Sequence, residues 1–274
     1  MGRVTGRRPV VRIVGHQRTK RPDTLVAEEP LEIRVGGRPY AVTMRTPGDD
    51  VDLVHGFLLS EGVITAADQV SGARYCLGTG PDGQNTYNVL DVALAPGMAA
   101  PSPDLTRNVY TSSSCGICGK ASIDAVRAQS AFSVAEDPLR LSVDVLAKLP
   151  DSLRDAQRVF EKTGGLHAAA LAAADGELGE VREDVGRHNA VDKVLGASMR
   201  GGAVPAAGKV LVVSGRASFE LVQKALMAGV PALAAVSAPS TLAVDLAAEA
   251  GMTLVGFLRG ETMNVYTGEH RILT

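Results

Sequence analysis

Six segments between residues 188 and 258 decide the fold: HNAVDKVLGASM (188–199), KVLVV (209–213), SFELVQKALMA (218–228), ALAAV (232–236), STLAVDLAAEA (240–250) and MTLVGFL (252–258). The three longer segments predict helices, and the three short apolar segments predict buried strands. Regular alternation of this kind is typical of right-handed βαβ crossovers and of a mostly parallel sheet that is covered on both faces.

The segment just before this alternation extends the sheet. A helix is expected over residues 151–162, followed by strands at 166–173 and 179–184. The turn Ala-Asp-Gly-Glu at 174–177 joins these strands, so they should pair antiparallel. One hairpin followed by three crossovers is also the element order of the cytidine deaminase-like fold, an analogy of fold alone. We therefore predict an α/β domain at 136–274: a three-layer mixed sheet with one antiparallel hairpin and otherwise parallel strands.

The amino-terminal part has a different order of predicted strands and helices. Alternating apolar residues predict a hairpin of strands 31–35 and 40–44, then a helix at 50–60 and strands at 73–77 and 86–94. These elements define a small α+β domain at 23–104. A C-x-x-C loop and helix follow at 105–135.

Composition narrows the class of protein. The chain has 274 residues, 45% of them apolar and 21% charged, which excludes global disorder. Its 28 basic and 30 acidic residues give a net charge of −2, which argues against a nucleic-acid partner. No apolar stretch approaches the ~20 residues that cross a bilayer, and three cysteines cannot form a disulfide framework. We expect a cytoplasmic protein without a membrane partner.

Residues 1–22 carry basic residues and no acidic residue. No apolar run follows that could serve as a signal peptide. We expect a flexible, solvated basic tail that touches an acidic partner at most, with an organelle transit peptide as the less favoured alternative.

Loops that follow parallel strands share one edge of the sheet, where ligands bind at helix N-termini. This edge should gather Arg187, Arg216 and Arg259 with several hydroxyl groups, an environment suited to phosphates and to a nucleotide-like ligand. The alternative is that Ser218 and Ser240 are ordinary helix caps and that the arginines solvate a surface.

The segment SSSCGICGK (112–120) precedes an expected helix. A helix N-terminus and Lys120 both stabilise a thiolate, so Cys115 is expected to be an accessible nucleophile with Cys118 as its resolving thiol. Too few further ligands remain for a zinc or iron–sulfur site. Two unreactive small residues are the alternative, and Cys76 is expected to be buried in a strand.

The histidines are less decisive. A zinc deaminase needs H-x-E and P-C-x-x-C at two helix starts, whereas this chain has His188-Asn189-Ala190 and Gly215-Arg216-Ala217-Ser218, which argues against that chemistry. His188 is expected to bind a ligand, to donate a proton or to cap its helix. His167 lies either at a site edge or in the core.

Five motifs resemble the FdhD family of formate dehydrogenase accessory sulfurtransferases, in the order expected for that family and from about residue 23 onward. They are SSSCGICGK (112–120), TGGLHAAA (163–170), EDVGRHNAVDK (183–193), SGRASFE (214–220) and FLRGETMNVY (257–266).

The resemblance implies a persulfide on Cys115, accepted from a cysteine desulfurase, with Cys118 as partner thiol. The sulfur would pass to the molybdenum of the bis-molybdopterin guanine dinucleotide cofactor, a bound substrate that later enters the formate dehydrogenase catalytic subunit. The family's cofactor-binding stretch falls on Phe257, Leu258, Arg259, Gly260, Glu261 and Thr262. The expected loops add Arg187, His188, Ser214 and Arg216. No permanently bound metal is expected, and the family suggests a homodimer.

Two other functions remain open at this point. One is a thiol–disulfide oxidoreductase that uses Cys115 and Cys118. The other is a non-catalytic chaperone that only holds the molybdenum cofactor.

Overall fold

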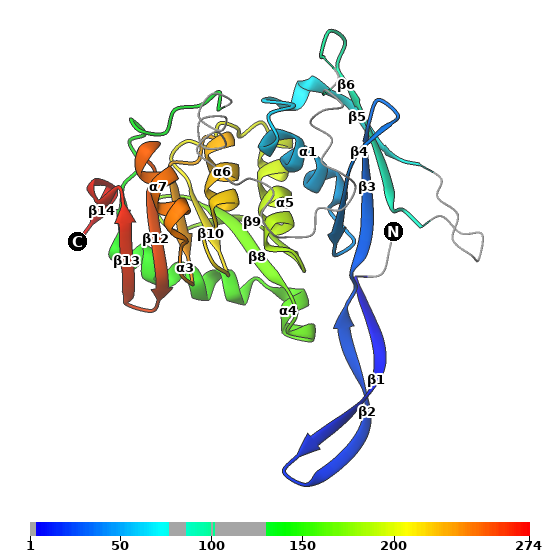
Figure 1. The fold of residues 1–274 in the computed structure, drawn as a ribbon. Coiled ribbons are helices and arrows are strands. Elements are labelled where there is room, and N and C mark those ends of the chain that lie inside the picture. The colour runs from blue at the N-terminus through cyan, green and yellow to red at the C-terminus, as the bar shows by residue number, and fades with distance from the viewer. Residues whose placement is uncertain (1–3, 77–85, 100, 102–129) are drawn as a thin grey trace.

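A six-stranded mixed sheet forms the centre of the molecule (Figure 1). The computed structural model describes residues 4–76, 86–99, 101 and 130–274. The strands lie in the order β13-β12-β11-β10-β8-β9. Their bounds are β8 (His167–Ala172), β9 (Leu178–Asp184), β10 (Val210–Val213), β11 (Ala232–Ala235), β12 (Thr253–Arg259) and β13 (Thr262–Thr267).

The strand directions confirm the hairpin and correct the rest of the prediction. β8 and β9 are antiparallel, and β10, β11 and β12 are parallel to one another, as expected. However, β8 also runs antiparallel to β10, because the crossover from β9 passes β8 and returns on its other side. A second hairpin adds β13 antiparallel to β12, since the chain reverses at Gly260, whose φ is 52°. The likeness to cytidine deaminases stays a prediction.

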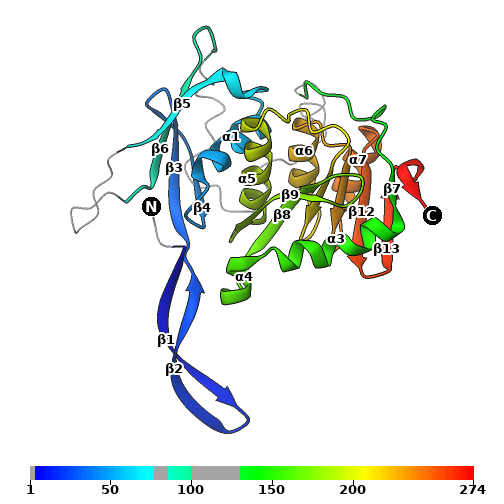
Figure 2. The same cartoon turned by 180° about the vertical axis from the view of Figure 1, so that it is seen from behind.

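Helices cover both faces of this sheet, which makes the α/β layers that the alternation predicted (Figures 1 and 2). On one face lie α5 (Arg187–Arg200), α6 (Phe219–Met227) and α7 (Thr241–Glu249). Side chains such as Leu211 and Val213 point into that layer. Val210 and Val212 point to the other face, which α3 (Val143–Asp155) covers.

The helix expected at 151–162 has different bounds. α3 begins eight residues earlier, after Ser142, whose side chain accepts a hydrogen bond from Val145 N, and it continues through Pro150. Its leucines at 146, 149 and 153 keep helical spacing and bury fully, which offsets the hydrogen bond that proline removes. A separate short helix, α4 (Arg158–Thr163), follows.

The amino-terminal unit is a four-stranded sheet with one helix. Its order is β4-β3-β6-β5, with β3 (Glu29–Val35), β4 (Arg38–Arg45), β5 (Val70–Tyr75) and β6 (Val89–Leu94). Positive φ angles at Gly36 and Gly37 make the turn of the β3–β4 hairpin. α1 (Asp50–Ser60) has the bounds that the sequence predicted.

Short strands β7 (Leu141–Ser142) and β14 (Ile272–Leu273) pair near the carboxyl terminus.

One hydrophobic core spans both halves of the chain. It unites Leu31, Ile33 and Leu90 of the amino-terminal sheet with Val191 and Leu195 of α5 and with the helix-covered face of the central sheet. Helix α1 packs between its own sheet and α5 (Figure 2). The boundaries expected near residues 104 and 135 stay a prediction.

The expected flexible tail is instead largely a β-hairpin. β1 (Thr5–Val14) pairs antiparallel with β2 (Gln17–Val26), and the ribbon projects away from the body of the molecule (Figures 1 and 2). β-Branched residues such as Val10, Val11 and Ile13 favour a strand. Gly15 adopts φ 59° in the connecting turn. The basic charge of this segment masked that pattern.

Candidate ligand-binding site

Three of the expected loops lie side by side at the carboxyl end of the parallel strands. Ala217 N donates to Ala238 O at 3.2 Å, and Ser240 N donates to Ala217 O at 3.0 Å. Ser237 N donates to Gly215 O at 3.2 Å, and Phe257 N donates to Ser237 O at 3.2 Å. These backbone bonds place the ends of β10, β11 and β12 on one continuous edge.

The start of α5 is attached to the start of α6 at this edge. His188 Nε2 lies 2.6 Å from the carboxylate Oε2 of Glu220 and 3.4 Å from the hydroxyl of Ser218. Ser218 occupies the cap position of α6 without making a side-chain cap bond, whereas Ser240 caps α7 by accepting from Ala243 N at 3.2 Å. The cap role expected as the alternative therefore holds for Ser240. The sequence reasoning missed Glu220, whose only signal was its place in the first turn of α6.

His167 lies at this edge of the sheet and is half-buried rather than enclosed in the core. It begins β8, and its ring lies so close to Gly215 that an added Cβ there would be 3.3 Å from Nδ1. Burial lowers the pKa of His167, and the positive charges of Arg187, His188 and Arg216 lower it further. The residues expected at the edge thus create a positive field at His167.

Arg187 has a buried hydrogen-bond donor at this edge. Its Nε atom is buried and has no hydrogen-bond partner within the part of the chain that the structure describes. Buried donors are nearly always satisfied in native proteins, so this donor requires an acceptor outside the described residues. Ser214, by contrast, is engaged: its Oγ accepts a hydrogen bond from Ala168 N at 2.9 Å and fixes the loop to β8.

The stretch 257–262 differs from the loop that was expected to leave the last strand. Phe257, Leu258 and Arg259 end β12, Gly260 and Glu261 form the turn, and Thr262 begins β13. Leu258 is fully buried in the core between the sheet and α3, so only its backbone can reach a ligand.

Phe257 and Arg259 remain available at the surface. Arg259 is exposed, and its Nε donates a long hydrogen bond of 3.4 Å to Val236 O. Phe257 has φ 52° and is 41% exposed, beside an irregularity in the β12–β13 register. A bulky residue in this conformation is strained, and such strain gathers at functional sites.

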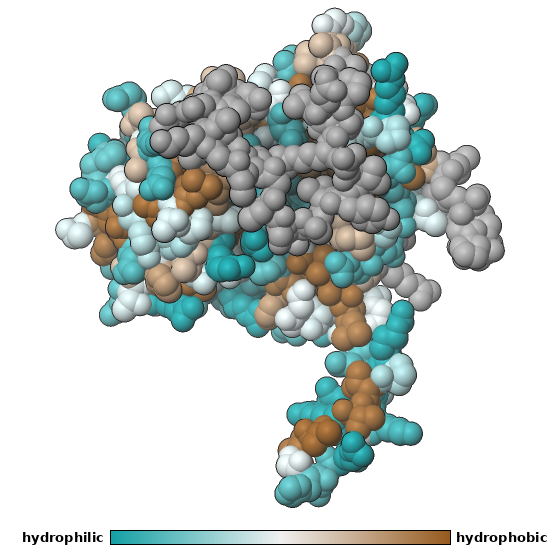
Figure 3. Space-filling view, in the orientation of Figure 1, coloured by the Kyte–Doolittle hydropathy of each residue, from teal (hydrophilic) through white to brown (hydrophobic). Residues whose placement is uncertain are grey.

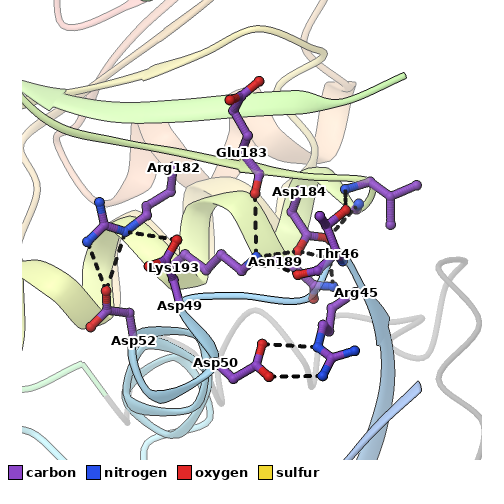
Figure 4. Close-up of polar contacts among 12 residues, drawn as sticks. Arg45, Thr46, Asp49, Asp50, Asp52, Arg182, Glu183, Asp184, Asn189 and Lys193 are labelled. Atoms are coloured by element: carbon purple, nitrogen blue, oxygen red, sulfur yellow. Dashed lines mark hydrogen bonds and ion pairs between the residues drawn. The ribbon is translucent and has the colours of Figure 1, made fainter. Parts of the chain in front are cut away.

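Behind the edge, a buried polar cluster holds the start of α5 (Figure 4). The carboxylate of Asp184 accepts from Lys193 Nζ at 2.8 Å, Gly186 N at 2.8 Å and Thr46 N at 3.1 Å. Asn189 Nδ2 donates to Met44 O at 2.7 Å. The segment 183–193 therefore contains two kinds of residue: Arg187 and His188 at the site, and inward residues that fix the turn before them.

The amino-terminal unit carries further ion pairs of this kind. Arg45 donates to both carboxylate oxygens of Asp50, at 3.0 and 2.9 Å, and Arg182 reaches across from β9 to Asp52 at 2.9 Å (Figure 4). Because these pairs join β4, α1 and β9, they fix the amino-terminal unit against the edge of the central sheet.

Cys115 and Cys118 lie outside the described residues. Cys76 follows β5, is half-buried rather than fully buried, and donates from its backbone to Val89 O at 2.9 Å. Across residues 4–76, 86–99 and 130–274, no group of three or more His, Cys, Asp and Glu side chains could hold a metal ion. Within the same ranges, no helix is long and apolar enough to cross a membrane.

Comparison with known proteins identifies the class. Residues 26–273 match the FdhD/NarQ family, and the chain belongs to that family. It is 64% identical to the sulfur carrier protein FdhD of Streptomyces avermitilis, over 99% of this chain and 97% of the relative. It is 57% identical to the protein of the same name from Mycobacterium tuberculosis, over 99% of this chain and all of the relative.

A solved structure shares the architecture. A crystal structure of a candidate formate dehydrogenase accessory protein from Desulfotalea psychrophila matches with a TM-score of 0.76 at 25% sequence identity. The match covers 99% of this chain and 100% of that one.

Proposed function

We propose that this protein is a sulfur carrier that serves formate dehydrogenase. It takes sulfur from a cysteine desulfurase as a persulfide on Cys115 and passes it to the molybdenum of the bis-molybdopterin guanine dinucleotide cofactor. The observation that carries the proposal is the 64% identity, over nearly the whole of both chains, to a sulfur carrier protein FdhD. The cationic edge is an independent observation that supports a phosphate-bearing cargo.

The loading step is a thiol exchange that balances without an added oxidant. The Cys115 thiolate attacks the outer sulfur of the desulfurase persulfide, a new S–S bond forms on Cys115, and the desulfurase cysteine leaves as a thiolate. Sulfane sulfur changes carrier and no net electrons are transferred. In this proposal, Cys118 acts as the partner thiol of Cys115 during delivery: its thiolate attacks the Cys115 sulfur, a Cys115–Cys118 disulfide forms, and the outer sulfur leaves at the sulfide level to the molybdenum. The two thiols supply the two electrons that reduce the sulfane sulfur, and a thiol reductant would then restore them.

The cofactor would bind as substrate at the cationic edge. Phosphate groups favour helix N-termini and arginine side chains, and this edge presents Arg187, Arg216 and Arg259. His188 and Ser214 contribute from the neighbouring loops. From the β12–β13 hairpin come the side chains of Phe257, Glu261 and Thr262 and the backbone of Leu258 and Gly260. No resident metal enters the proposal.

The proposed partners follow from this role. They are a cysteine desulfurase, the catalytic subunit of formate dehydrogenase and a second copy of the chain in a homodimer. The proposed location is the cytoplasm, with neither nucleic acid nor membrane as partner.

The decisive experiment is intact-mass analysis after incubation with a cysteine desulfurase and cysteine. We expect a gain of one sulfur atom that disappears in Cys115→Ala and persists in Cys76→Ala, the matched cysteine control. Cys115→Ala should also abolish downstream formate dehydrogenase activity. If no sulfur is gained, the holding chaperone and the thiol–disulfide oxidoreductase become the better functions. Retained downstream activity in Cys115→Ala would then select the chaperone.

A further inference from the structure

The β1–β2 hairpin, which we call the arm (residues 5–26), exposes apolar residues that nothing in the described part of the chain covers. Val11 is 51% exposed and Ile13 is 58% exposed. Only the base of the arm packs on the body, where Val26 lies beside Gly165 next to α4. Figure 3 shows the apolar residues as brown patches along the projecting ribbon, between hydrophilic ones.

An isolated two-stranded ribbon is at best marginally stable in water, because it has no third element to cover its apolar side chains. The exposed β-branched residues of the arm therefore call for a partner surface. Among the described residues, no third strand joins either long edge of the ribbon, since β1 and β2 form a sheet of their own.

The charge of the arm indicates that its partner surface is acidic. Six of the 28 basic residues but only one of the 30 acidic residues lie between residues 5 and 26, so the arm carries a net charge of +5. The remaining 22 basic and 29 acidic residues give the rest of the chain a net charge of −7. The net −2 of the whole chain hides two parts of opposite sign.

We propose that the arm packs against the acidic body, meaning the rest of the chain, of a second copy. The two copies would then exchange arms across a two-fold axis. Arm and body attract each other electrostatically, whereas two arms of like charge laid side by side would repel. Charge therefore favours contact between arm and body over an arm–arm sheet. The strand β1 has 10 residues. At about 3.3 Å per residue, a strand of that length reaches roughly 33 Å, enough to cross a good part of a neighbouring subunit.

This inference specifies the homodimer of the proposed function and rests on it for the dimeric state, but not for the sulfur chemistry. The test is the mass in solution by light scattering after gel filtration, in low and in high salt. The mass of one chain is 28.4 kDa. We expect twice this mass at low salt and dissociation as salt screens the attraction. The arm variant Arg12→Glu/Lys20→Glu should be monomeric under the same conditions. Val11→Ser/Ile13→Ser should shift the equilibrium toward monomer.

Lys148→Glu/Lys209→Glu is the matched control, since it reverses two exposed lysines of the body, and it should stay dimeric. Circular dichroism shows whether each variant is folded. Crosslinking from the variant Ile13→Cys, in a mixture of heavy- and light-nitrogen protein, should join the arm of one copy to the body of the other.

Three results would overturn the proposal. A monomeric full chain at every concentration and salt level removes the homodimer and the arm exchange together. A dimer that persists in Arg12→Glu/Lys20→Glu removes the arm exchange alone, and persulfide loading of Cys115 would still decide the sulfur carrier function. A monomer whose arm binds a fluorescent RNA oligonucleotide, with loss in the arm variant, would assign the arm to nucleic acid.

Discussion

Gly196 of α5 packs directly against the backbone of Gly56 in α1. A Cβ atom on Gly196 would lie 2.7 Å from the nitrogen of Gly56 and 1.8 Å from the carbonyl oxygen of Asp52. A Cβ atom on Gly56 would lie 1.9 Å from the carbonyl oxygen of Asp192. The two halves of the molecule therefore meet with main chain against main chain.

Gly196→Ala should destabilise the protein by about 3 kcal/mol, because rigid backbone atoms occupy the space of the new methyl group and both helices must move apart. Urea denaturation measures the change. Gly72→Ala is the control, since nothing lies within 4 Å of a Cβ at that position. Equal stability of the two variants would contradict the close helix crossing.

Lys193→Met should cost about 3–5 kcal/mol, because it leaves the Asp184 carboxylate buried without its countercharge. The two side chains are 1% and 0% exposed and lie 2.8 Å apart. Thermal or urea unfolding measures the loss. In the comparison variant Arg74→Gln, the lost pair is long and its arginine is largely exposed, so the free energy of unfolding should hardly change. A small effect of Lys193→Met would mean that the pair is not needed to hold α5.

Stability should fall as the pH drops below about 6.5, in part because of His55. Burial lowers the pKa of His55 in the folded protein, and nearby Arg200 lowers it further. Below the ordinary histidine pKa, the unfolded chain therefore takes up a proton that native His55 does not. His55→Gln should reduce the slope of stability against pH, measured by denaturation from about pH 8 to about pH 5. Identical slopes in His55→Gln and the unaltered chain would refute this origin.

Arg259→Ala and Arg216→Ala should each weaken the binding of guanosine diphosphate about 10- to 100-fold, the typical effect of losing one charge-assisted hydrogen bond. Isothermal titration calorimetry gives the affinity. Lys209→Ala is the control, because Lys209 precedes β10 at the opposite edge of the sheet. Persulfide loading of Cys115 should survive in all three variants. Unchanged affinity combined with reduced loading would show that the edge does not bind the nucleotide.

Guanosine diphosphate should bind more tightly as the pH falls toward the lowered pKa of His167, because a bound anion favours the protonated form of this ring. Without ligand, burial and the neighbouring positive groups lower the pKa of His167, which disfavours the protonated ring. His167→Asn should remove this share of the pH dependence in the same titrations. If the variant follows the pH profile of the unaltered chain, His167 does not face the ligand.

Local patterns predicted most of the central domain. Between residues 188 and 258, apolar periodicity placed each helix and strand to within one residue at either end, since every segment has one period and a clear boundary. The same reasoning predicted that the loops with Arg187, Arg216 and Arg259 meet at one edge. The prediction was wrong in two places. At the arm, the basic charge suggested a solvated tail in spite of the β-branched residues, and in α3, Pro150 suggested that the helix begins after it.

Other features depend on contacts between residues far apart in the sequence. The partner of His188 is Glu220, and the partners of Asp184 include Thr46, 138 residues away. No periodicity links such positions. The strain at Phe257 is equally invisible, because an aromatic residue in a strand pattern gives no sign of a positive φ.

The shared core has a consequence for synthesis on the ribosome. Chains emerge from their amino end, and domains generally fold as units while they emerge. Here the apolar face of β3, α1 and β6 packs on α5, which ends only at Arg200. The apolar surface of the first ninety or so residues therefore stays exposed until more than two thirds of the polypeptide has been synthesised. We therefore expect the nascent chain to be a client of ribosome-associated chaperones.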